Sequence, residues 1–198
     1  KESTPESVYY GGEYLEAGGN TNIYVEAYQG AAPRTKEFLS QLILATILGD
    51  ASSKHELPGN NLNSRLAKAF TGDNISQVNS FNSWESQTLF GVRAIGNESV
   101  KALSEKVHSQ LSALASSKIS KEELERARNT IKTRAKIFAD SRYGYLNAVK
   151  NFGGNLSEVD QALDSITTGD LQSRAKEILS TPRTTVVIGD LSNVPSFK

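Results

Sequence analysis

The sequence predicts an α/β (α+β) domain in which a mixed β-sheet is covered mainly on one face by helices. Strand-like segments occur at both ends of the chain, and a block of amphipathic helical segments lies between them. Such an arrangement is typical of one sheet that packs against one layer of helices. The length of 198 residues suits one domain, and 37% apolar residues can form its core. We therefore predict a single domain over residues 1–198.

The first 30 residues have the pattern of β structure. In residues 22–30, Ile23, Val25 and Ala27 alternate with Tyr24, Glu26 and Tyr28, which predicts a half-buried strand. Residues 8–20 are also strand-forming, but the pair Gly11-Gly12 interrupts them, as at a bulge or kink of an edge strand. The run 18–20 predicts a turn. The alternative of a phosphate-binding loop is disfavoured, because neither Gly-Lys-Ser/Thr nor a helix start follows the glycines.

The next segments predict a buried helix, a loop and a short helix. Pro33 suits a first helical position, apolar residues recur every three or four positions over 38–48, and Gly49 suits the end. Residues 50–61 have the composition of a loop. The run NSRLAKAF, residues 63–70, predicts the short helix.

Residues 74–84 and 88–96 form two strand-like runs with a few polar residues between them, so they predict an antiparallel hairpin. Asn97 is a candidate N-cap for a helix whose apolar stripe is Val100, Leu103, Val107, Leu111 and Leu114. Ser120 and Glu123 form a capping box for a second helix, with Leu124, Ala127, Ile131, Ala135 and Phe138 inward.

Three more helical segments are predicted, around 143–152, 156–166 and 171–179, and Pro182 ends the last one. The run TTVVIGD, residues 184–190, predicts a short strand in the middle of the sheet. Arg128, Lys132 and Lys136 share one face of the helix that starts at Ser120. That face is either a docking patch or a solvated surface, and we interpret it as solvated.

The residues that common chemistries require are missing from the sequence. The absence of cysteine excludes disulfides, cysteine-ligated metals and a cysteine nucleophile. His55 and His108 are 53 positions apart, so neither belongs to a helical zinc motif, and no G-x-S-x-G is present. We interpret both histidines as ordinary surface or boundary residues. We predict no catalytic, cofactor-binding or metal-ligating residue and no cofactor.

The overall charge argues against nucleic acid as a partner. Basic and acidic residues are equal in number, 22 of each, and no basic stripe is present. Phe81, Trp84 and Phe90 could stack on bases, but in hairpin strands such residues more often pack a core. No apolar run reaches the roughly 18–20 residues of a membrane span. Because the chain begins with Lys1 rather than methionine, we expect a processed or fragmentary product.

Several runs together resemble the second half of proteins of the pitrilysin-like (insulinase-type) family. They are YYGGEYLEAGG, NSRLAKAF, VNSFNSWESQTLFGVRAIG and the ending VVIGDLSNVPSF. The family includes the subunits of the mitochondrial processing peptidase and the two core subunits of ubiquinol–cytochrome c reductase, respiratory complex III. Within it, the resemblance is greatest to core subunit 2 of the fungal type.

This resemblance implies a parent protein of two homologous α/β halves, of which residues 1–198 are the second, C-terminal half. The zinc motif H-x-x-E-H of active members lies in the first half. Processing-peptidase α-subunits carry a glycine-rich loop at the position of residues 50–61, where this sequence has only Gly59. Active relatives also use an Arg/Tyr pair from the second half. Arg142-Tyr143 is similar in type, and we interpret it as a coincidence.

The function implied by the resemblance is that of a non-catalytic, structural core subunit of complex III. Its partners would be core subunit 1 and the other subunits of ubiquinol–cytochrome c reductase. It would lie on the matrix side of the inner mitochondrial membrane, attached through the complex. The alternative is the C-terminal half of a processing-peptidase subunit or related zinc metallopeptidase, forming a wall of a peptide-binding chamber. A third possibility is a free-standing adaptor domain.

Overall fold

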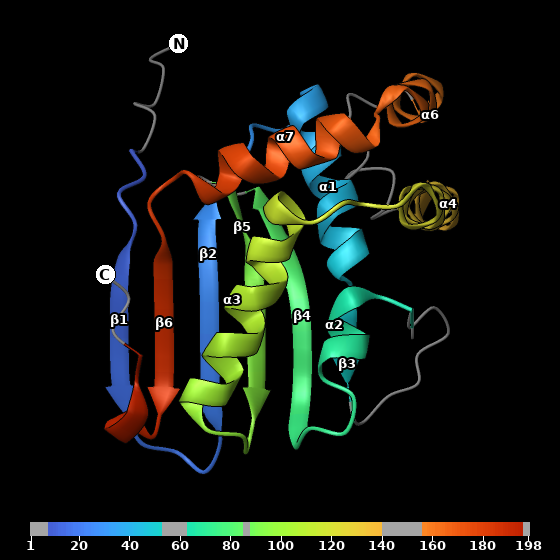
Figure 1. Cartoon of the computed structure of the whole chain (residues 1–198). Coiled ribbons are helices and arrows are strands. Elements are labelled where there is room, and N and C mark those ends of the chain that lie inside the picture. Colours follow the sequence, from blue (N-terminus) through green and yellow to red (C-terminus); the bar gives the residue numbers. More distant parts are fainter. Residues whose placement is uncertain (1–7, 53–62, 85–87, 140–155, 196–198) are drawn as a thin grey trace.

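A six-stranded mixed sheet forms one layer of the molecule, and helices form the other (Figure 1). The computed structural model describes residues 8–52, 63–84, 88–139 and 156–195. The strands are β1 (Gly12–Ala17), β2 (Asn22–Gln29), β3 (Asp50–Ser52), β4 (Ile75–Trp84), β5 (Thr88–Gly96) and β6 (Thr184–Gly189). The helices are α1 (Lys36–Leu48), α2 (Arg65–Ala69), α3 (Val100–Ser116), α4 (Lys121–Ala139), α6 (Leu156–Ser165), α7 (Thr168–Leu179) and the 3₁₀ turn η1 (Leu191–Asn193).

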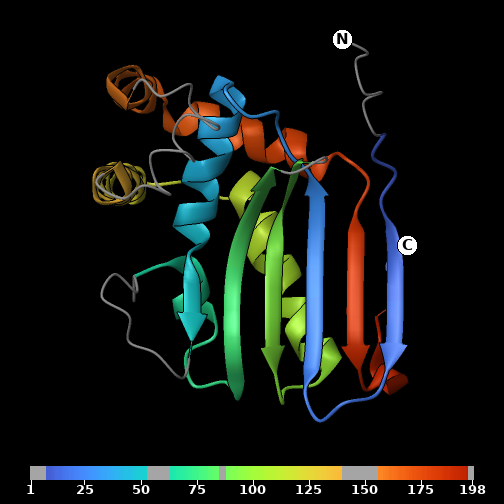
Figure 2. The same ribbon diagram turned by 180° about the vertical axis from the view of Figure 1, so that it is seen from behind.

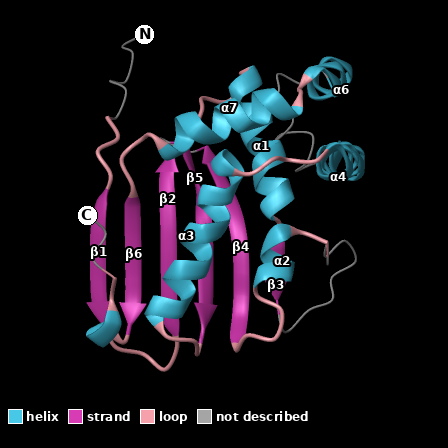
Figure 3. Ribbon diagram, viewed as in Figure 1, coloured by secondary structure: helices cyan, strands magenta, loops and turns pink. Residues whose placement is uncertain are grey.

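The strand order β1-β6-β2-β5-β4-β3 brings the two ends of the chain together. β1 and β6 are parallel, and every other neighbouring pair is antiparallel. The helices lie over one face of the sheet, with α3 crossing it (Figure 3). Seen from behind, the opposite face carries no helix of the described chain (Figure 2). These observations confirm the predicted mixed sheet with its helices mainly on one face.

The core lies between the sheet and the helices. The predicted stripe of α3 is fully buried, and Leu124, Ala127 and Ile131 of α4 are buried as well. In β2 the buried side chains that face the helices are Tyr24, Glu26 and Tyr28. The alternation of β2 was therefore predicted correctly, but the sequence did not indicate that a carboxylate belongs to the face beneath the helices.

Three predicted boundaries were wrong, each for a local reason. Helix α1 begins at Lys36, not near Pro33, because the Thr35 hydroxyl accepts a hydrogen bond of 3.1 Å from the amide of Phe38 and caps the helix. Helix α3 is capped by Ser99, whose hydroxyl accepts from the Ala102 amide at 3.1 Å, and not by Asn97. Residues 50–52 form β3, because they pair with β4 at the sheet edge.

Other predictions were confirmed. The Ser120–Glu123 capping box is present, with hydrogen bonds of 3.0 and 3.1 Å in the two directions. Residues 75–84 and 88–96 pair as the predicted antiparallel hairpin. β6 is an interior strand, between β1 and β2. The helix predicted around 143–152 lies outside the described residues.

The basic face of α4 is neither a docking patch nor simply solvated. Arg128 donates hydrogen bonds to the backbone carbonyls of Leu163, Asp164 and Ile166, at the C-terminal end of α6. Lys132 forms an ion pair of 2.5 Å with Asp164. The last carbonyls of a helix lack partners within the helix, and cations stabilise that end. Most of this basic face therefore holds α4 against α6, and of its three residues Lys136 is the exposed one.

Candidate interaction surface

The sheet face without helices carries an apolar band that spans four strands. The register places Val25 of β2 between Val186 of β6 and Arg93 of β5, and Ile23 between Ile188 and Ile95. The five aliphatic residues named in these pairs are half-buried, because the strands beside them cover part of each side chain. Successive residues of a strand point to opposite faces, so the band faces away from the helices. Its apolar members on the described strands are Ile23, Val25, Ala27, Phe81, Leu89, Ile95, Val186 and Ile188, and Tyr14 extends it onto β1.

Gly91 allows the band to be flat at its centre. A Cβ atom at Gly91 would lie 2.2 Å from the carbonyl oxygen of Glu26 and 2.8 Å from the ring of Phe81. The Phe81 ring therefore lies against the backbone at Gly91, opposite Ala27. Arg93 and Asn79 are the polar residues beside this ring, and their side chains approach to 3.4 Å. The band is therefore an apolar surface into which the exposed Arg93 and its neighbour Asn79 bring one polar pair.

A polar cluster lies on the opposite face of β2, beneath the helices. The Glu26 side chain has no exposed surface, and its Oε1 accepts from Arg183 Nη1 at 3.2 Å and from the Tyr28 hydroxyl at 3.4 Å. Nδ1 of His108 on α3 lies 2.8 Å from the same oxygen. The pKa values of the Tyr24 and Tyr28 hydroxyls are raised, mainly because both groups are buried and secondly because the Glu26 charge is close. Both hydroxyls therefore remain protonated.

This cluster has a structural role. It joins β2, α3 and the start of β6 through one buried carboxylate, whose charge needs such partners. His108 is about half exposed, in agreement with its interpretation as a boundary residue. No local pattern indicated the cluster, since Arg183 and His108 are 157 and 82 positions from Glu26. His55 and Arg142-Tyr143 lie outside the described residues.

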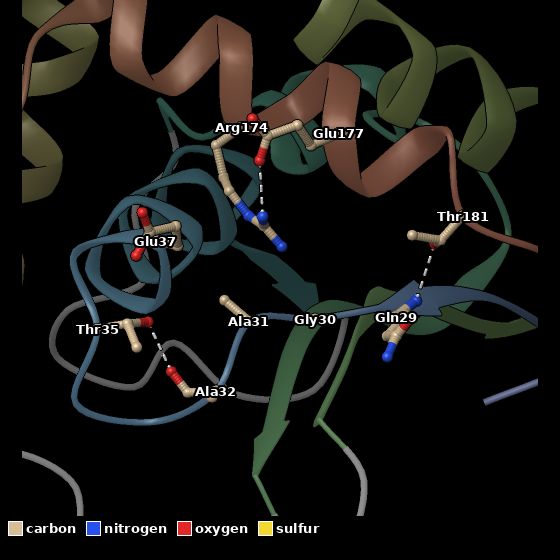
Figure 4. A pocket seen from close by; sticks show the side chains of 9 residues that line it. All are labelled: Gln29, Gly30, Ala31, Ala32, Thr35, Glu37, Arg174, Glu177 and Thr181. Atoms are coloured by element: carbon tan, nitrogen blue, oxygen red, sulfur yellow. Dashed lines mark hydrogen bonds and ion pairs between the residues drawn. The ribbon is translucent and has the colours of Figure 1, made fainter. Parts of the chain in front are cut away.

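A hollow of about 410 Å³ lies between the end of β2, the N-terminal end of α1 and the C-terminal part of α7 (Figure 4). Four of its side chains are engaged with each other or with backbone. Arg174 and Glu177 form an ion pair of 2.9 Å, and the hydroxyls of Thr35 and Thr181 donate to the carbonyls of Ala32 and Ile178. The residues that line it include no histidine. Because both threonine hydroxyls donate to backbone carbonyls and not to a carboxylate, neither is a nucleophile paired with a base.

Metal binding and membrane insertion concern the described ranges 8–52, 63–84, 88–139 and 156–195 as well. These residues contain no group of three or more His, Asp or Glu side chains placed to hold a metal ion. None of the described helices combines the length and the apolar character that a membrane crossing requires. The prediction of no catalytic, cofactor or metal residue stays a prediction for the whole chain. The geometry of the described part indicates an interaction surface.

Residues 4–131 match the family described as the peptidase M16 inactive domain. The chain belongs to this family. The description names an inactive domain, which supports the prediction that the M16 domain is a non-catalytic part of its protein.

Curated relatives connect this M16 domain with two mitochondrial assemblies. It is 30% identical, over 99% of its length, to mitochondrial-processing peptidase subunit alpha-2 of Dictyostelium discoideum, of which it covers 46%. It is 24% identical, over 94% of its length, to cytochrome b-c1 complex subunit 2 of Mus musculus, of which it covers 43%. The M16 domain thus spans less than half the length of these relatives.

Solved structures share the fold of the M16 domain. A chain of complex III2 from Candida albicans superposes with a TM-score of 0.80 at 16% identity, over 94% of the M16 domain and 48% of that chain. A protease from Helicobacter pylori superposes with a TM-score of 0.74 at 18% identity, over 96% of the M16 domain and 48% of the protease chain. The α+β fold with its mixed sheet is therefore confirmed. Similarity extends both to a complex III subunit and to processing-peptidase subunit α.

Proposed function

We propose that the M16 domain is the C-terminal half of a non-catalytic core subunit of mitochondrial complex III. The observation that carries the proposal is the sheet face without helices, whose apolar band a partner protein would cover. In addition, the hollow of the described part contains no nucleophile paired with a base. A structural subunit needs complementary surfaces rather than a reactive site. Residues 1–198 are then one domain, and another half of the parent protein would precede it.

The proposed partners are core subunit 1 and the other subunits of ubiquinol–cytochrome c reductase. The proposed location is the matrix side of the inner mitochondrial membrane, reached through the complex. The likeness to cytochrome b-c1 complex subunit 2 and to a complex III chain supports this assignment. The single glycine of residues 50–61, Gly59, supports it against a substrate-handling α-subunit.

The second candidate is the C-terminal half of a processing-peptidase subunit, where the same sheet face would form a wall of the peptide chamber. The 30% identity to subunit alpha-2 of the Dictyostelium peptidase favours it. To distinguish the two, the tagged parent protein is purified from its own mitochondria in mild detergent, and its subunits and its cleavage of presequence peptides are measured. We expect a complex of many subunits without cleavage. A two-subunit enzyme that cleaves presequences would overturn the assignment to complex III.

A further inference from the structure

The outer edge of β1 has no neighbouring strand in the described part of the chain. β1 is the terminal strand of the sheet, next to β6. The amides of Gly12 and Gly18 donate to β6-side carbonyls, those of Arg183 and Gly189, at 3.1 and 3.2 Å. Alternate residues of a strand direct their N–H and C=O groups to opposite edges. The backbone groups of Glu13, Leu15 and Ala17 therefore point to the outer edge.

Large exposed hydrophobic side chains gather at this same edge. Among the described residues, the large hydrophobic side chains that are exposed are those of Val8, Tyr10, Tyr14 and Leu15. Tyr10 is 80% exposed and Tyr14 is 54% exposed. All four lie within eight residues of sequence, at and just before β1. The concentration at one edge distinguishes them from scattered surface apolar residues, which need no explanation.

β1 lacks most of the features that usually protect a strand edge. Natural edge strands are shortened, bulged, interrupted by proline or covered by charged side chains, lysine above all. β1 pairs with β6 over six consecutive residues without a register shift, and the sequence GEYLEA has neither proline nor lysine. All six residues are exposed. The edge is therefore able to accept another strand.

The charges of β1 define the strand that fits it. The core of the strand is Glu13-Tyr14-Leu15-Glu16, so Glu13 and Leu15 lie on one face and Tyr14 and Glu16 on the other. Opposite charges directly across two strands stabilise their pairing, as do apolar pairs. The complementary strand thus reads basic–apolar–apolar–basic. The pattern of β1 is the same in both directions, so it fits a parallel or an antiparallel partner.

A second copy of this chain fits the edge less well than a basic segment does. In the antiparallel register centred on Leu15, Glu13 lies opposite Ala17 and Glu16 lies opposite Tyr14. Neither carboxylate then meets a cation, which a basic segment would supply. The sequence contains one basic–apolar–apolar–basic run, Arg65-Leu66-Ala67-Lys68. That run forms helix α2, and Leu66 is completely buried. The run that matches the pattern is therefore not free to pair with β1, and the partner strand comes from outside these 198 residues.

We propose that the outer edge of β1 binds an extended basic–apolar–apolar–basic segment of a partner protein by strand addition. Backbone hydrogen bonds from Glu13, Leu15 and Ala17 give the affinity, and Glu13 and Glu16 select the basic residues. The site is separate from the sheet face described above, because it uses an edge of the sheet. It goes beyond the proposed function and holds for either parent complex.

The test measures the binding of short fluorescein-labelled peptides to the 198-residue chain by fluorescence anisotropy. One peptide has a lysine–valine–valine–lysine core, and its control has a glutamate–valine–valine–glutamate core. We expect the basic peptide to bind at least about tenfold more tightly than the acidic one. The double variant Glu13→Lys/Glu16→Lys should reverse that preference. Equal binding of the two peptides, no binding of either, or an unchanged preference in the double variant would overturn the proposal.

A backbone variant tests strand addition itself. Leu15→Pro removes the outward amide of Leu15 without removing a hydrogen bond to β6, and Leu15→Ala keeps that amide. We expect Leu15→Pro to abolish binding of the basic peptide and Leu15→Ala to weaken it by only about threefold. Circular dichroism checks that each variant is folded, and if Leu15→Pro is not, the charge-reversal variant decides. Equal effects of the two folded Leu15 variants would exclude strand addition.

Discussion

Arg183 Nη1 lies 3.2 Å from Oε1 of Glu26, and this contact joins the start of β6 to the middle of β2. The two residues are 157 positions apart in the sequence. The Glu26 side chain has no exposed surface, whereas that of Arg183 is 22% exposed. A buried carboxylate that loses its cation destabilises a fold far more than the pair stabilises it. The contact therefore fixes the register of the two strands that carry most of the apolar band.

Removal of the arginine should be strongly destabilising. Arg183→Met leaves the Glu26 charge buried, and we expect the free energy of unfolding to fall by about 3 kcal/mol. The double variant Glu26→Gln/Arg183→Met also removes the charge and should recover most of this loss. Urea unfolding followed by circular dichroism measures both. Losses that simply add in the double variant would show that the two residues are not coupled.

The ion pair between α2 and α4 should make stability depend on acidic pH. Arg65 Nε lies 2.8 Å from Glu123 Oε1, and this hydrogen bond is the main reason that the pKa of Glu123 is below its ordinary value of 4.5. A lowered folded-state pKa contributes stability that is present above the unfolded value and is lost as the pH falls through the folded value.

We therefore expect the native chain to lose this contribution below about pH 4.5, where the Glu123 carboxylate of the unfolded chain begins to protonate. The variant Arg65→Gln lacks the main cause of the lowered pKa, so its stability should change less between neutral pH and about pH 3.5. Urea unfolding at a series of pH values measures the two curves. Parallel curves for the native chain and the variant would contradict this account.

Gly91 should not tolerate a side chain. The Cβ of Gly91→Ala would meet the Glu26 carbonyl at 2.2 Å, which is backbone that cannot rotate away. We expect a loss of at least about 2 kcal/mol, because strands β2 and β5 must separate to admit the methyl group. The matched control is Gly169→Ala in α7, where the nearest atom lies at 3.6 Å and alanine favours the helix. Its stability should stay equal or rise in thermal unfolding, and a similar effect of the two variants would refute the role of Gly91.

Arg128 should contribute to stability where Lys136 of the same helix face does not. Arg128→Met leaves the Leu163 and Ile166 carbonyls at the end of α6 without their charged donor, so we expect a loss of about 2 kcal/mol. Lys136→Met changes an exposed residue and should stay within about 0.5 kcal/mol of the native chain. Chemical unfolding of both variants measures this difference. A larger loss for Lys136→Met would show that the face has another role.

Local pattern was enough to predict most of the elements. The apolar stripe of α3 and the Ser120–Glu123 capping box are encoded within a few residues, and both occur as predicted. The cap of α3 was missed because Asn97 and Ser99 are both good capping residues, and only the turn after β5 selects Ser99. β3 was missed because its three residues owe their conformation to pairing with β4.

The interaction surface and the buried cluster depend on contacts between distant residues. Strand β2 has two alternating sets of side chains, and the pattern alone is compatible with burial of either one. The first set is Ile23, Val25 and Ala27, and the second is Tyr24, Glu26 and Tyr28. The helices cover the second set, where Tyr24 and Tyr28 join the core and where Arg183 and His108 come from elsewhere to hold Glu26. The same choice leaves the first set on the open face. Spacing along one strand carries no information about partners so far away.

The central claim is that this domain belongs to a structural subunit of complex III. Its most direct test is the reduced-minus-oxidised absorbance spectrum of the material that co-purifies with the tagged parent protein from its mitochondria. We expect the haem bands of cytochromes b and c1, in amounts stoichiometric with the tagged protein. Tagged protein recovered in its native assembly without these bands would contradict the claim.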